Sequence, residues 1–492
     1  MDFNAPDLNL IILAPLFVVI VWGMVIMLLD LVVSQERKQW IGWLSLVGYL
    51  VALVITVFLW GTEEGAFTPA GGHPMLLVDN YSNFLNVIFL LTGIISVLFS
   101  INYLSKAGIE RGEFYYLMMF SISGMMLMGM ANDLILVFLA LELLSIPLYV
   151  LSGFARPRLD SEESAMKYFL LGAFASGFLV FGVALIYGGT GSTALPDVVA
   201  NIGSSGVLGA AGAAFILVGL GFKVAAVPFH MWTPDVYEGA PTAVTAFMSV
   251  GAKVGGFAAL IRIFITALPD LDATWVPILA VISAITMIVG NVVALSQQNI
   301  KRMLGYSSIA HAGYIMMGVA AAGESPNGVS AALFYMLAYL FTNLGAFAVV
   351  IAVERRDGEG VMLDDYKGLA RRSPLMALAL AYFMLSLTGV PPTGGFSGKF
   401  FIFQSVLEAD LVWLAIIGVI TSVISGYFYL RVVYYAYMYE GEGEVTSRPE
   451  LSAAVAISAA VTLFLGILPG TLFVLAQEAA VSSLPHILAG LF

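Results

Sequence analysis

The sequence predicts an all-α polytopic membrane protein of about fourteen transmembrane helices, and three observations lead to that fold class. Hydrophobic residues make up 60% of the 492 positions and charged residues only 11%, whereas an ordinary soluble protein is about a quarter charged. Apolar runs of about 20 residues, the length that crosses a bilayer as a helix, recur along the whole chain. Lysine and arginine gather in alternate connections, as the loops on the cytoplasmic side of a membrane protein require.

The fourteen apolar runs are predicted helices, because they are too long for barrel strands and do not alternate every second residue. We expect a single membrane domain with three N-terminal helices (10–104), a five-helix repeat (114–266), a second five-helix repeat (275–439) and a final helix (451–476). The predicted spans are Leu10–Val33, Trp40–Trp60, Tyr81–Leu104, Phe114–Met130, Leu134–Phe154, Ala165–Tyr187, Val207–Val227, Thr242–Thr266, Trp275–Leu295, Leu304–Ala322, Ala331–Val353, Pro374–Leu407, Leu411–Tyr439 and Leu451–Ala476.

The loop charges predict the topology. Fifteen of the twenty lysine and arginine residues fall in odd-numbered loops and none in even-numbered loops, so we expect the odd loops in the cytoplasm and both termini on the outer face. The N-terminal run carries Asp2 and Asp7 without a basic segment, so we expect it to be a span and not a cleavable signal.

Composition also excludes several classes of function. The net charge is −12 and no basic cluster stands out, so nucleic acid is not an expected partner. Cysteine is absent, which excludes disulfides, thiolate zinc and cysteine-bound iron–sulfur clusters. The four histidines are scattered, and we expect no cofactor in this chain.

Five basic residues and one carboxylate remain inside predicted spans, where a charge costs at least ~2.5–3.5 kcal/mol on insertion scales. Arg262 and Arg431 lie near span ends, and we interpret both as interface anchors that reach toward water. Lys223, Lys253 and Lys399 are candidate proton carriers. Burial lowers the pKa of a lysine and a nearby carboxylate raises it, so a lysine whose partner can move can bind and release a proton. The alternative is that they are buried ion pairs that hold helices together.

Glu142 is an acidic residue near the middle of the fifth span. An ion pair with an intramembrane lysine would lower the free-energy cost of burying it, and the candidates are Lys223 and Lys253. The small residues Gly251 and Gly255 beside Lys253 predict close helix packing. His311 can titrate near neutral pH, although a buried, hydrogen-bonded histidine explains it equally well.

Two spans are predicted to be broken. Pro391, Pro392 and four glycines between positions 389 and 398 interrupt the twelfth span just before Lys399, and Pro228 follows Lys223 in the seventh. A broken helix at membrane depth is tolerated where it is buried or lines a wet cavity, and in transporters it marks the ion path. Each break falls in the fourth span of a five-span unit, which predicts two inverted repeats. Glu142, Lys223, Lys253, His311 and Lys399 then form a lateral proton path.

Three motifs resemble a known family. The stretch from Gly221 through Lys223, Pro228, His230 and Pro234 to Thr242, the stretch Lys301–Tyr314, and the stretch Pro391–Lys399 are similar to segments of the antiporter-like membrane subunits of respiratory complex I. The resemblance extends over essentially the whole chain. It implies that Glu142 pairs with Lys223 and that Lys253 connects them to Lys399.

The resemblance also implies a setting. The subunit would lie in the membrane arm of a bacterial plasma-membrane NADH–quinone oxidoreductase, beside other antiporter-like and small membrane subunits and in contact with the lipid bilayer. It would be a non-redox part of this translocase, with NADH, FMN, iron–sulfur clusters and quinone in other chains. Lys399 distinguishes this chain from the M-type subunits, which carry a glutamate at the corresponding position of the twelfth span. The ending after span fourteen differs from the L-type subunits, which have a long lateral helix.

Two alternatives remain open. The same fold serves Mrp-type sodium/proton antiporters, which are secondary transporters without a redox partner, although the seventh-span motif favours the complex I type. The chain could also transmit charge shifts, or hold the membrane arm together, without moving protons itself.

Overall fold

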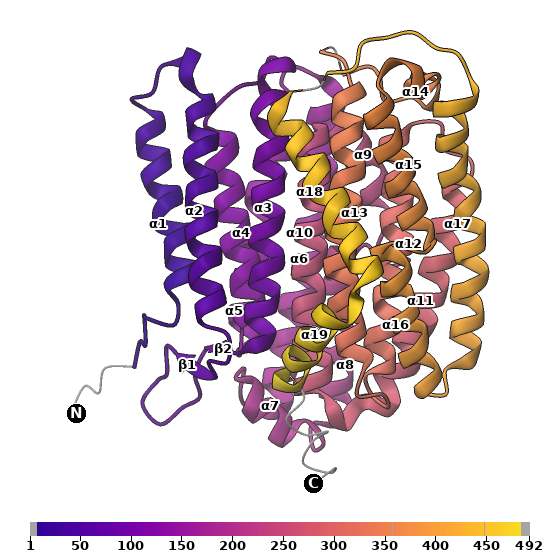
Figure 1. Ribbon diagram of the computed structural model, residues 1–492. Coiled ribbons are helices and arrows are strands. Elements are labelled where there is room, and N and C mark those ends of the chain that lie inside the picture. Colours follow the sequence, from indigo (N-terminus) through magenta and orange to yellow (C-terminus); the bar gives the residue numbers. More distant parts are fainter. Residues whose placement is uncertain (1–6, 357, 447, 484–492) are drawn as a thin grey trace.

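The computed structural model describes residues 7–356, 358–446 and 448–483 as a bundle of helices that run between two opposite ends (Figure 1). Its helices are α1 (Ala14–Asp30), α2 (Gln39–Phe58), α3 (Asn80–Lys106), α4 (Glu113–Met130), α5 (Leu134–Ser152), α6 (Leu159–Thr190), α7 (Leu195–Ile202), α8 (Gly206–Val224), α9 (Trp232–Gly239), α10 (Thr242–Ile261), α11 (Asp272–Ala294), α12 (Ile300–Ala321), α13 (Gly328–Val353), α14 (Leu369–Arg372), α15 (Pro374–Thr388), α16 (Gly394–Glu408), α17 (Val412–Met438), α18 (Pro449–Ile467) and α19 (Pro469–Ser483).

The predicted spans all fall on helices. Within the described ranges, ten helical segments are long and apolar enough to cross a bilayer, so the chain is a multi-pass membrane protein; the count of fourteen and the two repeats stay predictions. The short helices α7, α9 and α14 lie in segments that we expected to be loops. Between α2 and α3 the chain forms a small antiparallel hairpin of β1 (Glu64–Ala66) and β2 (Leu76–Val78).

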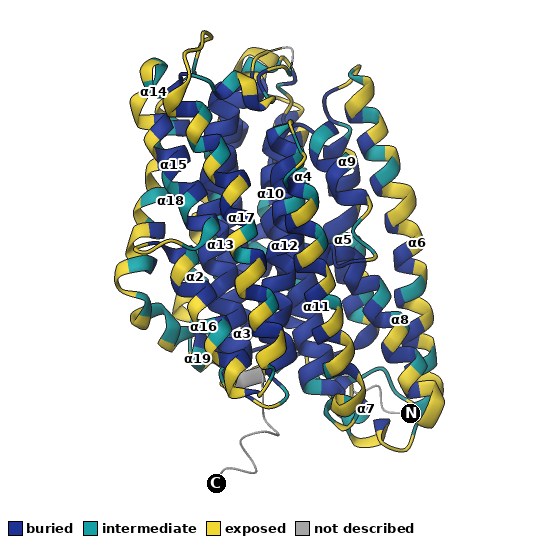
Figure 2. Ribbon diagram, turned by 90° about the vertical axis from the view of Figure 1, so that its right-hand side faces the viewer, coloured by how far each residue is buried: buried dark blue, intermediate teal, exposed yellow. Residues whose placement is uncertain are grey.

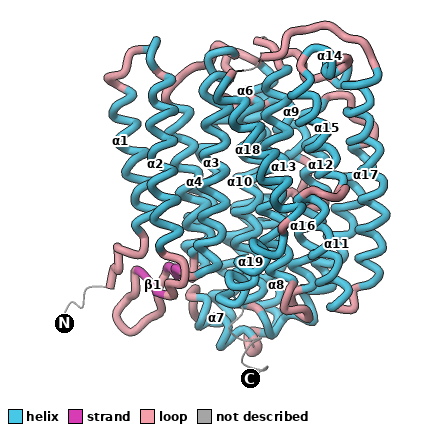
Figure 3. Tube along the Cα trace, viewed as in Figure 1, coloured by secondary structure: helices cyan, strands magenta, loops and turns pink. Residues whose placement is uncertain are grey.

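The twelfth span is broken as predicted. It divides into α15 and α16, and Figure 3 shows loop segments within the height of the bundle as well as at its ends. The prediction of an unbroken fourteenth span is wrong, because α18 ends at Ile467 and α19 begins at Pro469. Proline lacks the N–H that would continue the helix, and its ring disfavours helical backbone at Leu468.

The core is formed by α10 and α13, in which every residue is buried. Figure 2 shows these two helices in dark blue, behind helices with exposed faces. The outer helices present large apolar side chains, such as Phe58, Phe174 and Val423, of which 69% to 84% is exposed. Contiguous exposed apolar surface of this kind suits lipid.

The basic loops meet at one end of the bundle. The α1–α2 connection with Arg37, the α5–α6 connection with Arg158, and α14 with Arg371 all lie at the top in Figure 1. We call this end of the bundle the basic end. The β1–β2 hairpin and α19 lie at the opposite end (Figure 1).

Candidate functional site

Lys223 lies in the last turn of α8, where the seventh span breaks. The helix ends because Ala225 adopts a left-handed backbone with φ of 64°, and the chain then continues toward the basic end as α9 (Figure 1). The side chain of Lys223 is 3% exposed, and its ammonium donates hydrogen bonds to Ser145 Oγ at 2.8 Å and to Tyr168 Oη at 3.0 Å. Its position near a helix C-terminus, where carbonyls are unpaired, favours the cation.

Glu142 lies on α5, three residues before Ser145, and is half-buried. Its carboxylate accepts a hydrogen bond from Ser176 of α6 at 2.5 Å. The expected ion pair with Lys223 is not formed: within the described residues, both side chains bond to hydroxyl groups. Glu142 nevertheless acts on Lys223 electrostatically, so the two charges are neighbours without direct contact.

Lys253 is buried in the middle of α10 and donates to the backbone carbonyl oxygen of Ser308 on α12. The glycines of α10 make its packing possible. A Cβ at Gly256 would lie 2.8 Å from Val224 and 3.3 Å from Lys223, so Gly256 lets α10 contact the end of α8 that carries the first lysine.

His311 lies on α12 and is 3% exposed. Its Nδ1 is 2.6 Å from Tyr335 Oη and its Nε2 is 3.1 Å from Tyr429 Oη, whose hydroxyl is in turn 2.5 Å from Ser307 Oγ. The ring also lies within electrostatic range of Lys253 and Lys399. Both ring nitrogens therefore bond to tyrosine hydroxyl groups, and the ring is a neighbour of both lysines.

Lys399 lies in the second turn of α16 and is 4% exposed. Its ammonium reaches back across the break and donates to the carbonyl oxygens of Leu387 and Thr388, at 3.1 and 2.9 Å, where α15 ends. It also donates to Ser422 Oγ at 2.8 Å and lies 4.6 Å from the ring centre of Tyr314. The break thus creates the acceptors that hold the lysine.

The five predicted site residues are therefore held mainly by neutral groups. The sequence does not indicate these hydroxyl partners, because tyrosine and serine do not stand out in an apolar helix. A tyrosine in a helix that is predicted to be buried would indicate such a partner, because a buried hydroxyl usually forms a hydrogen bond. The partners are Ser145, Tyr168, Ser176, Tyr335, Ser422 and Tyr429.

Arg262 is not an interface anchor, so that prediction is wrong. Its side chain is 1% exposed and binds both carboxylate oxygens of Asp79, at 2.7 and 3.1 Å, and the carbonyl oxygen of Gly129 at 2.9 Å. A buried charge needs such a partner, and Asp79 at the start of α3 supplies it. Arg431 donates to the carbonyl oxygens of Leu295 and Gln297 and so fastens α17 to the end of α11.

Comparison with known proteins places this arrangement in a family. Residues 131–425 match the family described as "NADH:quinone oxidoreductase/Mrp antiporter, TM". NADH-quinone oxidoreductase subunit N of Chloroflexus aggregans is 49% identical over 98% of this chain and 99% of its own. The same subunit of Trichlorobacter lovleyi is 45% identical over 97% of this chain and 99% of its own.

Solved structures agree with this placement. A chain of respiratory complex I from Thermus thermophilus superposes with a TM-score of 0.80 at 35% identity, covering 94% of this chain and 99% of that one. A chain of the Mrp complex from Dietzia has a TM-score of 0.87 at 23% identity, over 98% and 99% of the two chains, which shows a shared fold. The chain therefore belongs to the NADH:quinone oxidoreductase/Mrp antiporter family of membrane proteins, in which its full-length relatives are complex I subunits of the N type.

Proposed function

We propose that this chain is the N-type membrane-arm subunit of an NADH–quinone oxidoreductase and that it moves protons across the membrane without redox chemistry of its own. The carrier path consists of Glu142, Lys223, Lys253, His311 and Lys399. NADH, FMN, iron–sulfur clusters and quinone belong to other subunits, and quinone reduction there drives the transfer.

The observation that supports this proposal most is how the buried lysines are held. Lys223 and Lys399 are almost fully buried, yet in the described structure they bond to hydroxyls and carbonyls and not to carboxylates. In a static ion pair, loss of the lysine proton would leave the partner carboxylate buried and unpaired. An ammonium that is bonded to neutral groups can lose its proton without that cost. Arg262 with Asp79 shows what a purely structural pair looks like in the same protein.

We further propose that the basic end faces the cytoplasm of a bacterial cell, that the membrane is the plasma membrane and that both termini lie outside. The excess of lysine and arginine at this end supports that orientation. The sodium/proton antiporter alternative is less supported, because the Mrp likeness at 23% identity concerns the fold, while the N-type relatives are 45% to 49% identical.

The test is proton translocation by the whole complex in proteoliposomes, measured as protons moved per NADH oxidised. Replacing Lys223, Lys253 or Lys399 by alanine should lower that ratio while the complex still assembles. Lys367→Ala is the control, since Lys367 is a partly exposed lysine at the basic end whose partner Asp364 is 72% exposed, so its loss leaves no buried charge unpaired. Normal pumping in all three alanine variants would refute the carrier role, and pumping that needs sodium would favour the antiporter.

A further inference from the structure

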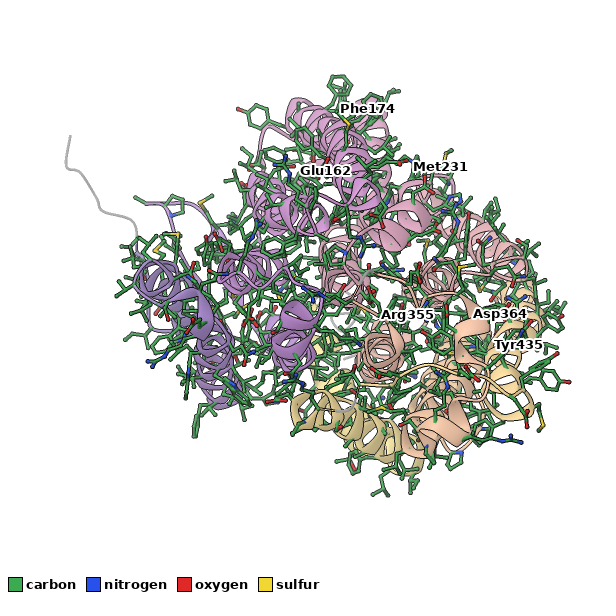
Figure 4. All side chains as sticks on the ribbon, turned by 90° about the horizontal axis from the view of Figure 1, so that it is seen from above. Glu162, Phe174, Met231, Arg355, Asp364 and Tyr435 are labelled. Carbon is green, nitrogen blue, oxygen red and sulfur yellow. The ribbon has the colours of Figure 1, made fainter. Side chains whose placement is uncertain are left out.

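A buried carboxyl group lies at the basic end, outside the path described above. Glu354 directly follows the last residue of α13 and is 3% exposed. Its Oε1 accepts a hydrogen bond from Tyr103 Oη at 3.3 Å, and its Oε2 has no hydrogen-bond partner among the residues that the structure describes. Arg355, the next residue, lies near the middle of the bundle when it is seen from above (Figure 4).

The surroundings of Glu354 are basic but do not neutralise it by direct contact. Tyr103 also accepts a hydrogen bond from the backbone N–H of Thr242, which fixes its hydroxyl beside the carboxyl. The ammonium of Lys301 is turned toward the carbonyl oxygens of Glu238 and Ala240, at 2.8 and 2.6 Å. The titratable groups that act on Glu354 come from α3, the α5–α6 connection, α12 and the segment before α14, and they are Tyr103, Lys106, Arg158, Lys301 and Tyr366.

Burial raises the pKa of Glu354, and Lys301 and its other neighbours only partly offset that rise. A carboxyl that is buried, near cations and bonded on one oxygen can accept and release a proton at modest cost. A carboxylate that served only as a structural clip would have both oxygens paired, as Asp79 has with Arg262.

Three packed helices lead from Glu354 to the central lysine. Lys253 lies eleven residues after Thr242 on α10, which is about 16 Å at 1.5 Å per residue. Over this height the facing sides of α10, α12 and α13 carry polar side chains, and Asn343 Nδ2 donates to Ser249 Oγ at 2.6 Å. Four of their buried atoms, Thr242 Oγ1, Ser308 Oγ, Tyr339 Oη and Asn343 Oδ1, lack a well-formed hydrogen bond in the described residues, although Thr242 lies near Glu354 and Ser308 lies near Tyr339. Buried polar atoms of this kind bind internal water.

We propose that Glu354 takes up protons from the aqueous phase at the basic end and passes them along α10, α12 and α13 to Lys253. The inference rests on the proposed function, since it needs Lys253 to be a carrier. In each cycle the Glu354 carboxylate binds one proton delivered by water and releases it to the water and hydroxyl groups beside Thr242. The carboxylate is then restored, and Lys253 becomes an ammonium.

The test compares variants of the whole complex in proteoliposomes, again as protons moved per NADH oxidised. Glu354→Gln keeps the size of the side chain and the acceptor for Tyr103 but cannot ionise. It should lose as much translocation as Lys253→Ala, and Glu354→Asp should recover part of the loss. Asp364→Asn is the matched control, because Asp364 lies at the same end (Figure 4) and its side chain is 72% exposed, so this variant should leave the ratio unchanged.

The outcomes separate the two proposals. If Lys253→Ala loses translocation and Glu354→Gln pumps normally, the uptake role of Glu354 is wrong and the proposed function stands. If Lys253→Ala pumps normally, the proposed function itself fails. If neither glutamate variant assembles, Glu354 is structural and the inference is wrong.

A pH profile gives a second readout. Tyr103→Phe removes the hydroxyl that donates to the Glu354 carboxylate, and loss of that bond makes the carboxyl harder to ionise. The alkaline limb of the pumping profile should therefore move to higher pH, whereas an unchanged profile in Tyr103→Phe would contradict the uptake role.

Discussion

Lys399 and Gly389 lie against each other across the break in the twelfth span. Gly389 has a left-handed backbone with φ of 93°, and a Cβ there would lie 3.0 Å from Lys399 Cδ. We expect Gly389→Ala to misplace the lysine, both through this contact and because a left-handed residue with a side chain costs about 1–2 kcal/mol.

Translocation per NADH should fall in Gly389→Ala, with NADH oxidation by the remote subunits retained. Gly177→Ala is the matched control, since a Cβ at Gly177 has open space around it. Equal pumping by both variants would show that the break does not position Lys399.

The hydroxyl partners of Lys223 should be as important for proton translocation as Glu142, the carboxylate that the sequence indicates as its partner. Tyr168→Phe and Ser145→Ala each remove one acceptor from a buried ammonium, and hydrogen bonds to charged groups contribute about 1.5–3 kcal/mol. Each variant should lower translocation, and the double variant should approach Lys223→Ala. A double variant that pumps like the unmodified complex would leave Glu142 as the important neighbour.

The buried pair of Arg262 and Asp79 should be structural. Arg262→Gln leaves the Asp79 carboxylate buried and unpaired, which costs about 3–5 kcal/mol. We expect less assembled complex and a lower thermal midpoint, partly restored by the double change Arg262→Gln with Asp79→Asn. If the complex assembles fully but does not pump, the pair belongs to the proton path.

Glu354 should also make stability depend on pH. Burial raises its pKa above the ordinary value, so the folded protein binds more protons than the unfolded chain between the two pKa values, and stability falls as pH rises through that window. Glu354→Gln removes this effect. We therefore expect the difference in thermal unfolding midpoint, Glu354→Gln minus unmodified complex, to depend on pH. This difference should rise with pH from about 4.5, the ordinary pKa, and level off above the raised pKa. A difference that does not depend on pH would mean that Glu354 does not titrate there.

Much of the helical architecture could be predicted from local chemistry. Runs of apolar residues locate the helices, and the prolines and glycines before Lys399 locate a break, because both effects act within a few residues of the chain. The fourteenth span shows the limit of this reasoning. Its apolar run continues past Leu468, although Pro469 ends the helix there. A hydropathy scale contains no information about the backbone N–H that proline lacks.

The sequence by itself identified Lys223, Lys253 and Lys399 as buried, since the membrane makes a charge within a span costly wherever its helix packs. It did not identify Lys301 and Glu354, which lie at helix ends and are buried by tertiary packing. Only the tertiary structure decided what holds them. It paired Arg262 with Asp79, which lies 183 positions away in the chain, placed Lys223 on Ser145 and Tyr168, and left one oxygen of Glu354 without a partner in the described residues. The reason is physical: burial follows from composition within one helix, whereas a hydrogen-bond partner follows from which helices meet and at what height.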